Sequence, residues 1–488
     1  MIYDVLIIGG GITGCSIGFE LSKYDLKVKM VEKHNDISMM TTKANSGIVH
    51  AGYDPKPGTK MARLNVLGSK LYKTLARDLN VHYVNNGSLV IGRNDKDKEI
   101  INELFKRGKA NGVEDLAILT TDEIRKIEPS INQEVNYALY APTAAIVSPW
   151  EMALALGENA VRNGMELSLE TEVLDINKVG DKFVVKTSKG DIEARYVINA
   201  AGLYADRIND LAIKDHKEEH FDITPVKGEY YLLDKVEGKL ANTVIFQTPN
   251  ELGKGVLVSK TVHGNLIVGP NASSEVLSKD DVSTTSKALN YVRTASVLSV
   301  PTINFRNNIR NFSGERATIV GRDDFLIEES KVVSGFINFA GIKSPGLSCG
   351  PAFGLEAVDM LKKAGLEFKE NKNFKITPLP KFFKDMTKDE INHKIESNPL
   401  YGRIICRCET VSEGEIVDAL HRPIVCPTID GVKRRTNAGM GRCQGGFCGP
   451  KVLEIIKRET GLKAMDILQD KAGSHIVLAH TKGGDENE

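Results

Sequence analysis

The chain has 488 residues, too many for one small core, and length alone predicts roughly two to four domains. Its 41% hydrophobic and 26% charged residues are typical of a globular protein, and 64 basic against 64 acidic residues give no basic excess for nucleic acid. No apolar run approaches the ~20 residues of a membrane helix, and a strand-like run at residue 3 leaves no room for a signal peptide. We therefore expect a cytoplasmic protein that is not an integral membrane protein. Peripheral attachment to the inner face of the membrane stays open.

The first motif of the chain has the pattern of a dinucleotide-binding unit. A strand-like run at residues 3–8 precedes Gly9, Gly11 and Gly14 in G-x-G-x-x-G spacing, and a predicted helix follows. The glycines permit a tight turn, a close approach of the backbone to a pyrophosphate and close packing of helix on strand. The phosphates would lie at the helix N-terminus, where free N–H groups favour negative charge. A second predicted strand ends at Glu32, which would accept hydrogen bonds from the ribose of an adenosine.

Hydrophobic periodicity then predicts alternating helices and strands. The predicted helices are residues 60–79, 95–111, a short helix from Thr120 to the residue before Pro129, 149–163, a helix-like stretch at 276–297, and a last one that ends near 363. The predicted strands are residues 87–92, 167–177, 182–187 and 196–199, with antiparallel sheet over 223–270.

The fold class expected from this order is α/β. It combines a discontinuous Rossmann-like nucleotide-binding domain, a mixed antiparallel-sheet substrate domain inserted into it, and a small C-terminal module with four cysteines. The predicted boundaries are 1–80, 145–215 and 326–365 for the nucleotide domain, 81–144 and 216–325 for the substrate domain, 366–400 for a linker, 401–465 for the metal module and 466–488 for a charged tail.

Five of the seven cysteines lie in the C-terminal part of the chain, which indicates metal binding rather than disulfides. Cys406-x-Cys408 and Cys443-x4-Cys448 supply four thiolates in two pairs, a set that suits a [2Fe-2S] cluster or tetrahedral zinc. The C-x-C pair favours iron–sulfur, because structural zinc sites favour C-x2-C. Cys426 fits neither pair.

Several motifs occur in an order that resembles one superfamily. They are Gly9-x-Gly11-x-x-Gly14 with Glu32, Thr42-x-x-Asn45-Ser46-Gly47-x-x-His50-x-Gly52, Asn199-Ala-Ala-Gly202 with Asp206, Gly314-x-Arg316, and Gly341-x-x-Ser344-Pro-Gly-Leu347. Over about residues 1–365 the chain resembles the flavoenzymes of the glycerol-3-phosphate dehydrogenase, D-amino-acid oxidase and L-2-hydroxyglutarate dehydrogenase superfamily. Within this superfamily it resembles the anaerobic subunit-A-type glycerol-3-phosphate dehydrogenases. Residues 405–409 and 439–448 resemble the bacterioferritin-associated-ferredoxin-like module that some of these enzymes carry.

The resemblance implies FAD as the cofactor. It places the backbone of Val173 at adenine, residues 42–48 along the pyrophosphate and flavin, and the helix after Leu347 with its N-terminus at the flavin N1–C2 edge. The FAD-binding residues that it implies are Gly9, Gly11, Gly14, Glu32, Thr42, Asn45, Ser46, Gly47, Val173, Ala201, Gly202, Gly341, Ser344, Pro345, Gly346 and Leu347.

Oxidation of an alcohol at a flavin also needs a base for the hydroxyl proton and cations for an anionic substrate. His50 is the candidate base, since imidazole titrates near neutrality, with a structural histidine as the alternative. Arg316 resembles the arginine that holds the substrate in this superfamily, and its alternative is a surface ion pair with Glu315 or Asp323. Lys343 would meet a phosphate, and its alternative is a solvated lysine on a turn.

Four further residues are weaker candidates. Tyr53, Tyr230 and Lys254 are expected to line the pocket. Cys349 is expected to be a small packing residue, with a redox role near the flavin as the alternative.

These observations predict an FAD-dependent dehydrogenase that oxidises sn-glycerol 3-phosphate to dihydroxyacetone phosphate, with His50, Arg316 and Lys343 as catalytic residues. Electrons would leave through a [2Fe-2S] centre to a partner flavoprotein or membrane subunit. The alternatives are the same machinery acting on L-2-hydroxyglutarate or another 2-hydroxy or amino acid, a peroxide-forming oxidase with a structural cysteine module, and a zinc-bound docking module without electron transfer.

Overall fold

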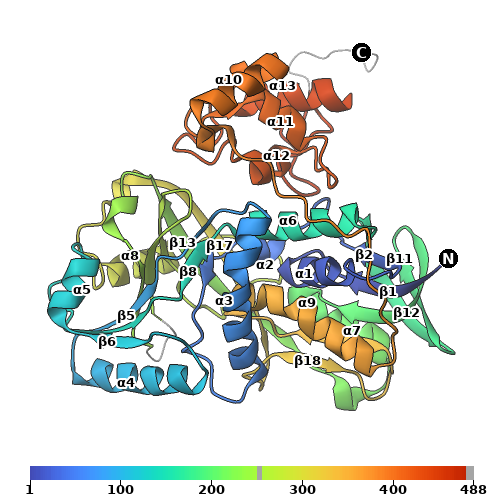
Figure 1. The fold of residues 1–488 in the computed structure, drawn as a ribbon, viewed down its shortest axis with the longest axis horizontal. Helices are drawn as coiled ribbons and strands as arrows, with labels where there is room; N and C mark the ends of the chain where they lie inside the picture. Colours follow the sequence, from blue (N-terminus) through green and yellow to red (C-terminus); the bar gives the residue numbers. More distant parts are fainter. Residues whose placement is uncertain (250–254, 480–488) are drawn as a thin grey trace. The chain divides into compact units, whose positions relative to one another are not determined.

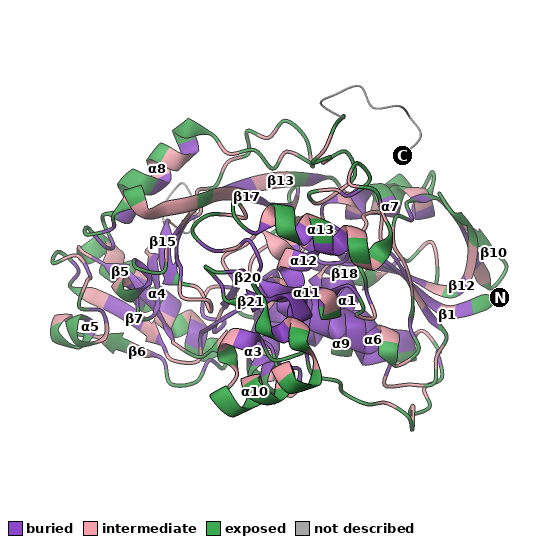
Figure 2. Cartoon of the chain, turned by 90° about the horizontal axis from the view of Figure 1, so that it is seen from above, coloured by how far each residue is buried: buried purple, intermediate pink, exposed green. Residues whose placement is uncertain are grey.

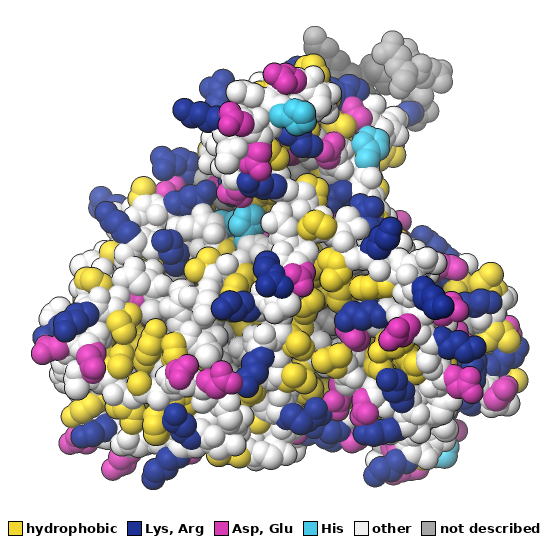
Figure 3. Space-filling model, in the orientation of Figure 1, with side chains coloured by type: hydrophobic (Ala, Val, Ile, Leu, Met, Phe, Trp, Pro, Cys, Tyr) yellow, Lys and Arg dark blue, Asp and Glu magenta, His cyan; other side chains and the backbone are white. Residues whose placement is uncertain are grey.

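The computed structural model describes residues 1–249 and 255–479, and the chain divides into two units (Figure 1). The first unit comprises residues 1–33 and 37–378, and the second comprises residues 34–36 and the chain from residue 379 onward. None of the helices in these described stretches is long and apolar enough to cross a membrane. On the face drawn in Figure 3, acidic and basic side chains are interspersed, as expected from equal numbers of both.

The first unit begins with the predicted dinucleotide-binding pattern: strand β1 (Ile2–Ile8), helix α1 (Ile12–Leu21) and strand β2 (Val28–Val31). Strand β1 pairs in parallel with β2 on one side and with β12 (Gly190–Asn199) on the other. Every residue of α1 is buried, because α6 (Pro149–Arg162) and α9 (Gly346–Lys363) pack against it (Figure 2). Buried parallel strands require such cover on their faces.

The sheet around β1 has eight strands. Its main order is β10-β11-β12-β1-β2-β9, and β19 (Phe336–Ala340) pairs with both β12 and β18 (Leu326–Glu329). The single strand predicted over 167–177 is wrong, because the chain forms β9 (Glu166–Ser168) and β10 (Val173–Val179) instead. Between them Glu170 has a φ of +51°, a turn conformation that no strand accommodates. Strand β11 (Lys182–Thr187) follows as predicted.

A second eight-stranded sheet has the order β17-β13-β16-β15-β14-β5-β7-β6. Its strands are β5 (Ser88–Gly92), β6 (Ala117–Leu119), β7 (Tyr137–Ala141), β13 (Ile223–Leu233), β14 (Val244–Gln247), β15 (Leu257–Lys260), β16 (Leu266–Gly269) and β17 (Asn308–Ile319). All neighbours are antiparallel except β14 and β5. The antiparallel sheet predicted over 223–270 is confirmed.

Smaller elements complete the first unit. They are α2 (Met40–Lys43), α3 (Lys60–Asp78), α4 (Asp95–Ala110), α5 (Thr121–Ile127), α7 (Ala205–Ile213), α8 (Ser286–Ser296), and the three-stranded sheet of β3 (Ile48–Val49), β4 (Tyr83–Val84) and β8 (Ala145–Val147). The helix expected over 276–297 starts only at Ser286, because the Thr285 side chain caps the helix there by accepting from the Ala288 amide.

The stretch predicted as a linker, residues 366–400, is more structured than expected. The Asn371 amide donates to the Lys23 carbonyl at 2.8 Å, and the Thr377 amide donates to Asn159 at 2.7 Å, so its first part lies along the first unit. Its second part contains helix α10 (Lys388–Ser397), which starts with a capping box between Thr387 and Glu390. This T-x-x-E pattern is present in the sequence and is typical of a helix start.

The second unit is built from α10, the hairpin β20 (Ile404–Cys406) and β21 (Val411–Ser412), and helices α11 (Glu413–Ala419), α12 (Ile429–Thr436) and α13 (Gly449–Thr460). Its apolar core includes Ile416, Val432 and Ile456. The predicted charged tail falls partly on residues 480–488, which lie outside the described residues.

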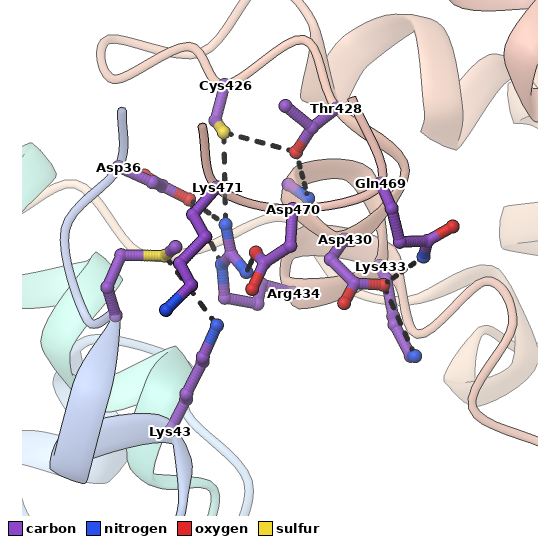
Figure 4. A network of polar contacts seen from close by, with 12 residues as sticks. Asp36, Lys43, Cys426, Thr428, Asp430, Lys433, Arg434, Gln469, Asp470 and Lys471 are labelled. Atoms are coloured by element: carbon purple, nitrogen blue, oxygen red, sulfur yellow. Dashed lines mark hydrogen bonds and ion pairs between the residues drawn. The ribbon is translucent and has the colours of Figure 1, made fainter. Parts of the chain in front are cut away.

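Polar interactions around Asp36 also belong to the second unit (Figure 4). The Asp36 carboxylate is fully buried and accepts hydrogen bonds from Arg434 at 2.8 Å and from Arg435 at 2.8 and 2.9 Å. Arg434 donates a further bond to Asp470 at 2.7 Å. Cys426 lies 3.8 Å from an Arg434 nitrogen, so this cysteine packs within the network. Burial raises its pKa to about 11.

Candidate active site

The glycine-rich turn has the geometry that its sequence predicts. Gly9 has a φ of +111°, and a Cβ at this position would lie 2.5 Å from the Ala200 carbonyl oxygen. A Cβ on Gly14 would lie 1.9 Å from the Gly9 oxygen, so no larger residue fits there. The Gly10 amide donates to Glu32 Oε2 at 2.7 Å, which holds this carboxylate against the turn. The sequence placed Glu32 correctly at the end of β2, next to the glycine-rich turn.

A cavity of about 590 Å³ opens at this end of the first sheet and extends to the second sheet. It brings together His50, Arg316 and Lys343, the three predicted catalytic residues. The predicted FAD-binding residues that line it are Gly11, Thr42, Asn45, Ser46, Gly202, Ser344, Pro345, Gly346 and Leu347. Five separate segments of the chain therefore converge on one space, and the size of this space suits a large cofactor.

The other predicted FAD-binding residues are not among the described residues that line this cavity. They are Gly9, Gly14, Glu32, Gly47, Val173, Ala201 and Gly341. Among them, Gly47 has a φ of +67°, and a Cβ there would lie 2.6 Å from the Val147 oxygen, so its role is in the backbone turn. Val173 is buried at the start of β10.

His50 is held by contacts of its backbone and its ring. Its amide donates to the Ser348 hydroxyl at 2.8 Å, and its carbonyl accepts from Asn65 at 2.7 Å. The imidazole stacks on Phe246, with the ring centroids 5.4 Å apart. Because Ser348 belongs to α9, these contacts fix the imidazole relative to the N-terminus of that helix.

Arg316 lies on β17, the edge strand of the second sheet. Its Nη2 donates one long hydrogen bond, 3.5 Å, to the Asn271 carbonyl, and its guanidinium also contacts the Tyr230 hydroxyl. Within the described residues, neither carboxylate oxygen of Glu315 has a partner, and Asp323 pairs with Lys56 and Lys343. The alternative of a surface pair with Glu315 or Asp323 is therefore not realised. The neighbouring Tyr230 is fully buried and stacks on Phe312 at 4.8 Å. Burial raises the pKa of Tyr230, while the nearby Arg316 charge opposes that shift.

Lys343 lies in the turn before α9 and is paired with Asp323 at 3.2 Å. Asp323 also pairs with Lys56 at 3.1 Å, so one carboxylate bridges two lysines that line the cavity. These two lysines lower the pKa of Asp323. Lys56 was not predicted as a site residue, and Asp323 was named only as an alternative partner of Arg316. Both lie in short loops just outside the motifs, four residues after Gly52 and seven residues after Arg316. Only the excess of charged residues in these two loops could have marked them.

Glu315 is a second acid beside the cavity. It is 2% exposed, and neither of its carboxylate oxygens has a hydrogen-bond partner. Burial raises its pKa to about 7, and the nearby Asp281 adds to the shift. Successive side chains on a strand point to opposite faces, so Glu315 points away from the face that carries Arg316.

The N-terminus of α9 also reaches the cavity through Pro345, Gly346, Leu347 and Ser348. The first turn of this helix contains no acidic residue, so its free amides keep their positive potential. Cys349, in the same turn, is fully buried in the apolar core, and burial raises its thiol pKa. This supports its interpretation as a packing residue.

The weaker pocket candidates have different outcomes. Tyr230 lines the cavity. Tyr53 is not among the described residues that line the cavity. It belongs to the apolar core of the second sheet and lines a small hollow with His50 and Pro345, which also line the cavity. The third candidate, Lys254, lies outside the described residues.

In the second unit, the four predicted metal ligands come from two places. Cys406 ends β20 and Cys408 follows it, while Cys443 lies in a glycine-rich loop and Cys448 immediately precedes α13. Cys408 Sγ and Cys443 Sγ are 3.7 Å apart. The Cys448 thiol donates to Cys406, and this bond together with backbone amides lowers the pKa of Cys406 to about 6.

The sulfur atoms therefore form two pairs, Cys406 with Cys448 and Cys408 with Cys443. Within the described residues, the one group of three potential ligands that converge within 4.8 Å contains none of these cysteines. One tetrahedral zinc with Zn–S bonds of about 2.3 Å would bring all four sulfurs to within about 4 Å of each other. Two pairs of thiolates suit two iron atoms with two ligands each.

Comparison with known proteins identifies a family for each of the two parts of the chain. The family described as FAD dependent oxidoreductase matches residues 4–360, and the BFD-like [2Fe-2S] binding domain matches residues 404–458. The chain is 47% identical over 482 residues to a glycerol 3-phosphate dehydrogenase of Caloramator mitchellensis, which covers 98% of this chain and 99% of that protein. It is 34% identical over 366 residues to a glycerol 3-phosphate oxidase of Mycoplasma pneumoniae, with 73% of this chain and 94% of that protein covered.

Among solved structures, the chain is similar to the dithionite-reduced L-alpha-glycerophosphate oxidase of Mycoplasma pneumoniae with FAD bound. The TM-score is 0.73 at 32% sequence identity, and the match covers 78% of this chain and 100% of that one. These matches confirm the predicted fold class and the predicted cofactors. The chain belongs to the family of FAD dependent oxidoreductases and carries a BFD-like [2Fe-2S] binding domain in its C-terminal part.

Proposed function

We propose that the protein oxidises sn-glycerol 3-phosphate to dihydroxyacetone phosphate, with FAD as the hydride acceptor. The observation that carries this proposal is the convergence of His50, Arg316 and Lys343 on the cavity that the glycine-rich turn and the N-terminus of α9 also line. The dehydrogenase and the oxidase named above act on the same substrate and support this choice. When bound, FAD supplies a two-electron acceptor for the substrate C2–H.

His50 would accept the proton of the substrate C2 hydroxyl. An imidazole is suited to this role because it exchanges protons near neutral pH. Its backbone is held at both the amide and the carbonyl, and Phe246 supports the ring, so little conformational freedom would be lost when substrate binds.

Arg316 and Lys343 would hold the oxygen atoms of the substrate. Arg316 has nearly all its donors available, and a guanidinium can stabilise the negative charge that develops on the C2 oxygen. Lys343 and Lys56 offer two point charges at the same rim, which suits a dianionic phosphate. Asp323 would have to release at least one of these lysines to the phosphate.

Residues of the first unit also fit FAD itself. The Gly9–Gly14 turn would accept the pyrophosphate, and Glu32 the ribose hydroxyls. The N-terminus of α9 would face the flavin N1–C2 edge, where negative charge appears on reduction. Val173 is proposed to contact adenine through its backbone.

We further propose that electrons leave through the C-terminal cysteine module to a protein partner, a flavoprotein or a membrane subunit. A [2Fe-2S] centre passes electrons singly, whereas the flavin accepts two. The two pairs of sulfurs support this assignment over zinc. In this proposal the protein is a cytoplasmic dehydrogenase, and the oxidase activity of its relatives is the alternative.

The test is the anaerobic visible spectrum of the full-length protein during titration with sn-glycerol 3-phosphate. Oxidised flavin absorbs near ~450 nm, and hydride transfer bleaches this band. Bleaching by glycerol 3-phosphate but not by L-2-hydroxyglutarate is expected, and the reverse result would move the assignment to 2-hydroxy acids. Admitting oxygen then separates the two electron routes, because an oxidase forms hydrogen peroxide in step with substrate turnover and a dehydrogenase does not.

A further inference from the structure

We propose that His82, Glu151 and His263 form a binding site for a divalent transition-metal ion, with zinc as the ion that fits best. The three side chains come from separate segments of the first unit. His82 immediately precedes β4, Glu151 lies in the first turn of α6, and His263 lies in the turn between β15 and β16. None of them lines the active-site cavity as described, so the site is independent of the proposed reaction.

The ligand atoms are already close together. His82 Nδ1 lies 2.7 Å from Glu151 Oε2, and His263 Nε2 lies 3.3 Å from Glu151 Oε1. Each of the three residues offers one ligand atom, and these three atoms lie within 4.8 Å of one another. Zinc bonds to nitrogen and oxygen are about 2.0–2.2 Å, which places neighbouring ligands about 3.3 Å apart in a tetrahedron. Side-chain shifts of about an ångström would therefore accommodate an ion.

The donor set is one that metals of this class prefer. Two neutral imidazoles and one carboxylate suit zinc and other first-row ions, and three protein ligands leave one position for water. The Glu151 side chain is 3% exposed and that of His263 is 9% exposed, whereas that of His82 is 28% exposed. An ion would thus enter past His82 and meet a largely buried carboxylate.

The charge of Glu151 gives an independent reason to expect a cation. Within the described residues, its partners are His82 and His263, which carry a positive charge only when protonated. Its buried Oε1 has His263 Nε2 beside it at 3.3 Å, a contact too poorly aligned to count as a good hydrogen bond. A buried carboxylate is costly without a compensating charge, and a dication supplies that charge while both imidazoles remain neutral.

Surrounding contacts hold the ligands in place. The His82 amide donates to Glu151 Oε2 at 3.1 Å, and the His82 carbonyl accepts from the Ser148 amide at 3.0 Å. The indole of Trp150 stacks on the His263 ring, with centroids 6.1 Å apart and planes 26° apart. Such outer contacts fix the orientation of ligating side chains. A hydrogen-bonded His–Glu–His triad without metal is the competing interpretation of the same geometry.

The experiment uses the full-length protein, purified anaerobically so that the cysteine module keeps its own metal. The protein is dialysed against zinc, and zinc, iron and flavin are then counted per chain. We expect one zinc ion per chain in addition to the iron of the cysteine module. In crystals of this protein, an anomalous difference peak at the zinc edge should lie beside Glu151. A zinc-free protein, or a peak at the cysteines only, would overturn the proposal.

Two variants locate the ion, and one matched variant serves as the control. His263→Gln and His82→Gln should each weaken zinc binding by about tenfold or more. His216→Gln removes an exposed histidine that also contacts a carboxylate, Glu218 at 3.2 Å, and should leave zinc binding unchanged. Circular dichroism and the flavin spectrum report folding of each variant. If either ligand variant folds and still binds zinc as the wild type does, the triad is not the site.

Discussion

Arginine side chains have opposite surroundings in two regions of the molecule. In the second unit, Arg434 and Arg435 are 3% and 4% exposed, and the fully buried Asp36 binds both of them. At the active-site cavity, Arg316 is only partly buried and makes one 3.5 Å bond to a carbonyl. The first two guanidinium groups are saturated and serve the fold, whereas the third has few partners in the folded protein, which fits its proposed role in holding the substrate. The supply of anionic partners, not the residue type, separates a structural from a functional arginine.

The largest effect should come from breaking the saturated arrangement. Asp36→Asn leaves two buried guanidinium groups facing a neutral amide, and the loss of such a charge costs about 3–5 kcal/mol. Native-state hydrogen exchange of the full-length protein should show this as faster exchange in α11, α12 and α13. Glu454→Gln is the control, because Glu454 pairs with Lys457 of its own helix at 3.2 Å, its side chain is 66% exposed, and its loss should cost less than about 1 kcal/mol. Equal effects of the two substitutions would show that Asp36 does not organise this unit.

Changing Arg316, which has few hydrogen-bond partners, should affect activity rather than stability. Arg316→Lys keeps the charge but loses the fork of donors, and we expect kcat/KM for glycerol 3-phosphate to fall by about 10²–10³, or roughly 3–4 kcal/mol. The thermal midpoint should stay nearly constant, because little in the folded protein depends on this side chain. Arg310→Lys, on the same strand, is the matched control and should keep wild-type kinetics. A stability loss in Arg316→Lys without a kinetic effect would reverse its assignment.

Acid should weaken the saturated network in a defined pH range. The two arginines lower the pKa of Asp36 from 3.8 to about 2, although burial opposes this shift. The pKa of this carboxyl is lower in the folded state than in the unfolded state. Its contribution to the free energy of unfolding is therefore fully present at pH values above the unfolded-state pKa, and it is lost as pH falls through the folded-state pKa. The expected loss is about 2 kcal/mol between pH ~4 and ~2. The difference in urea midpoint between wild type and Asp36→Asn should therefore narrow over this range, and a constant difference would contradict the mechanism.

Lys343→Gln should have a smaller and more selective effect. Removing one of two lysines at the rim should raise KM for glycerol 3-phosphate by about tenfold, since a charged hydrogen bond contributes roughly 1.5 kcal/mol. A carboxylate substrate of this superfamily, L-2-hydroxyglutarate, should be affected less. Steady-state kinetics with both substrates provides the measurement. Unchanged kinetics with glycerol 3-phosphate would exclude Lys343 from phosphate binding.

The contrast between the two regions also shows what the sequence could reveal. Gly9, Gly14 and the four cysteines of the C-terminal module were predictable because each follows from a local requirement, such as a backbone without Cβ or two thiolates close together in the chain. Asp36 with Arg434, or Asp323 with Lys56, joins residues whose separation in the chain carries no periodic signal. The strand predicted over 167–177 failed for a related reason, because hydrophobic alternation does not report the turn at Glu170.

The smallest expected effect is that of Asp323→Asn, which tests whether the lysines at the cavity are held by an acidic partner. Asp323 bridges Lys56 and Lys343, so a phosphate must compete with this carboxylate for both lysines. Asp323→Asn removes the competitor, and since its side chain is 74% exposed the gain should be modest, below about 1 kcal/mol, or a two- to fivefold lower KM for glycerol 3-phosphate. The gain should shrink as salt is raised, because exposed charges are screened. It should also shrink in the Lys343→Gln background, where one of the two released lysines is missing. A higher KM in Asp323→Asn would mean that the carboxylate positions the lysines for phosphate instead of competing with it.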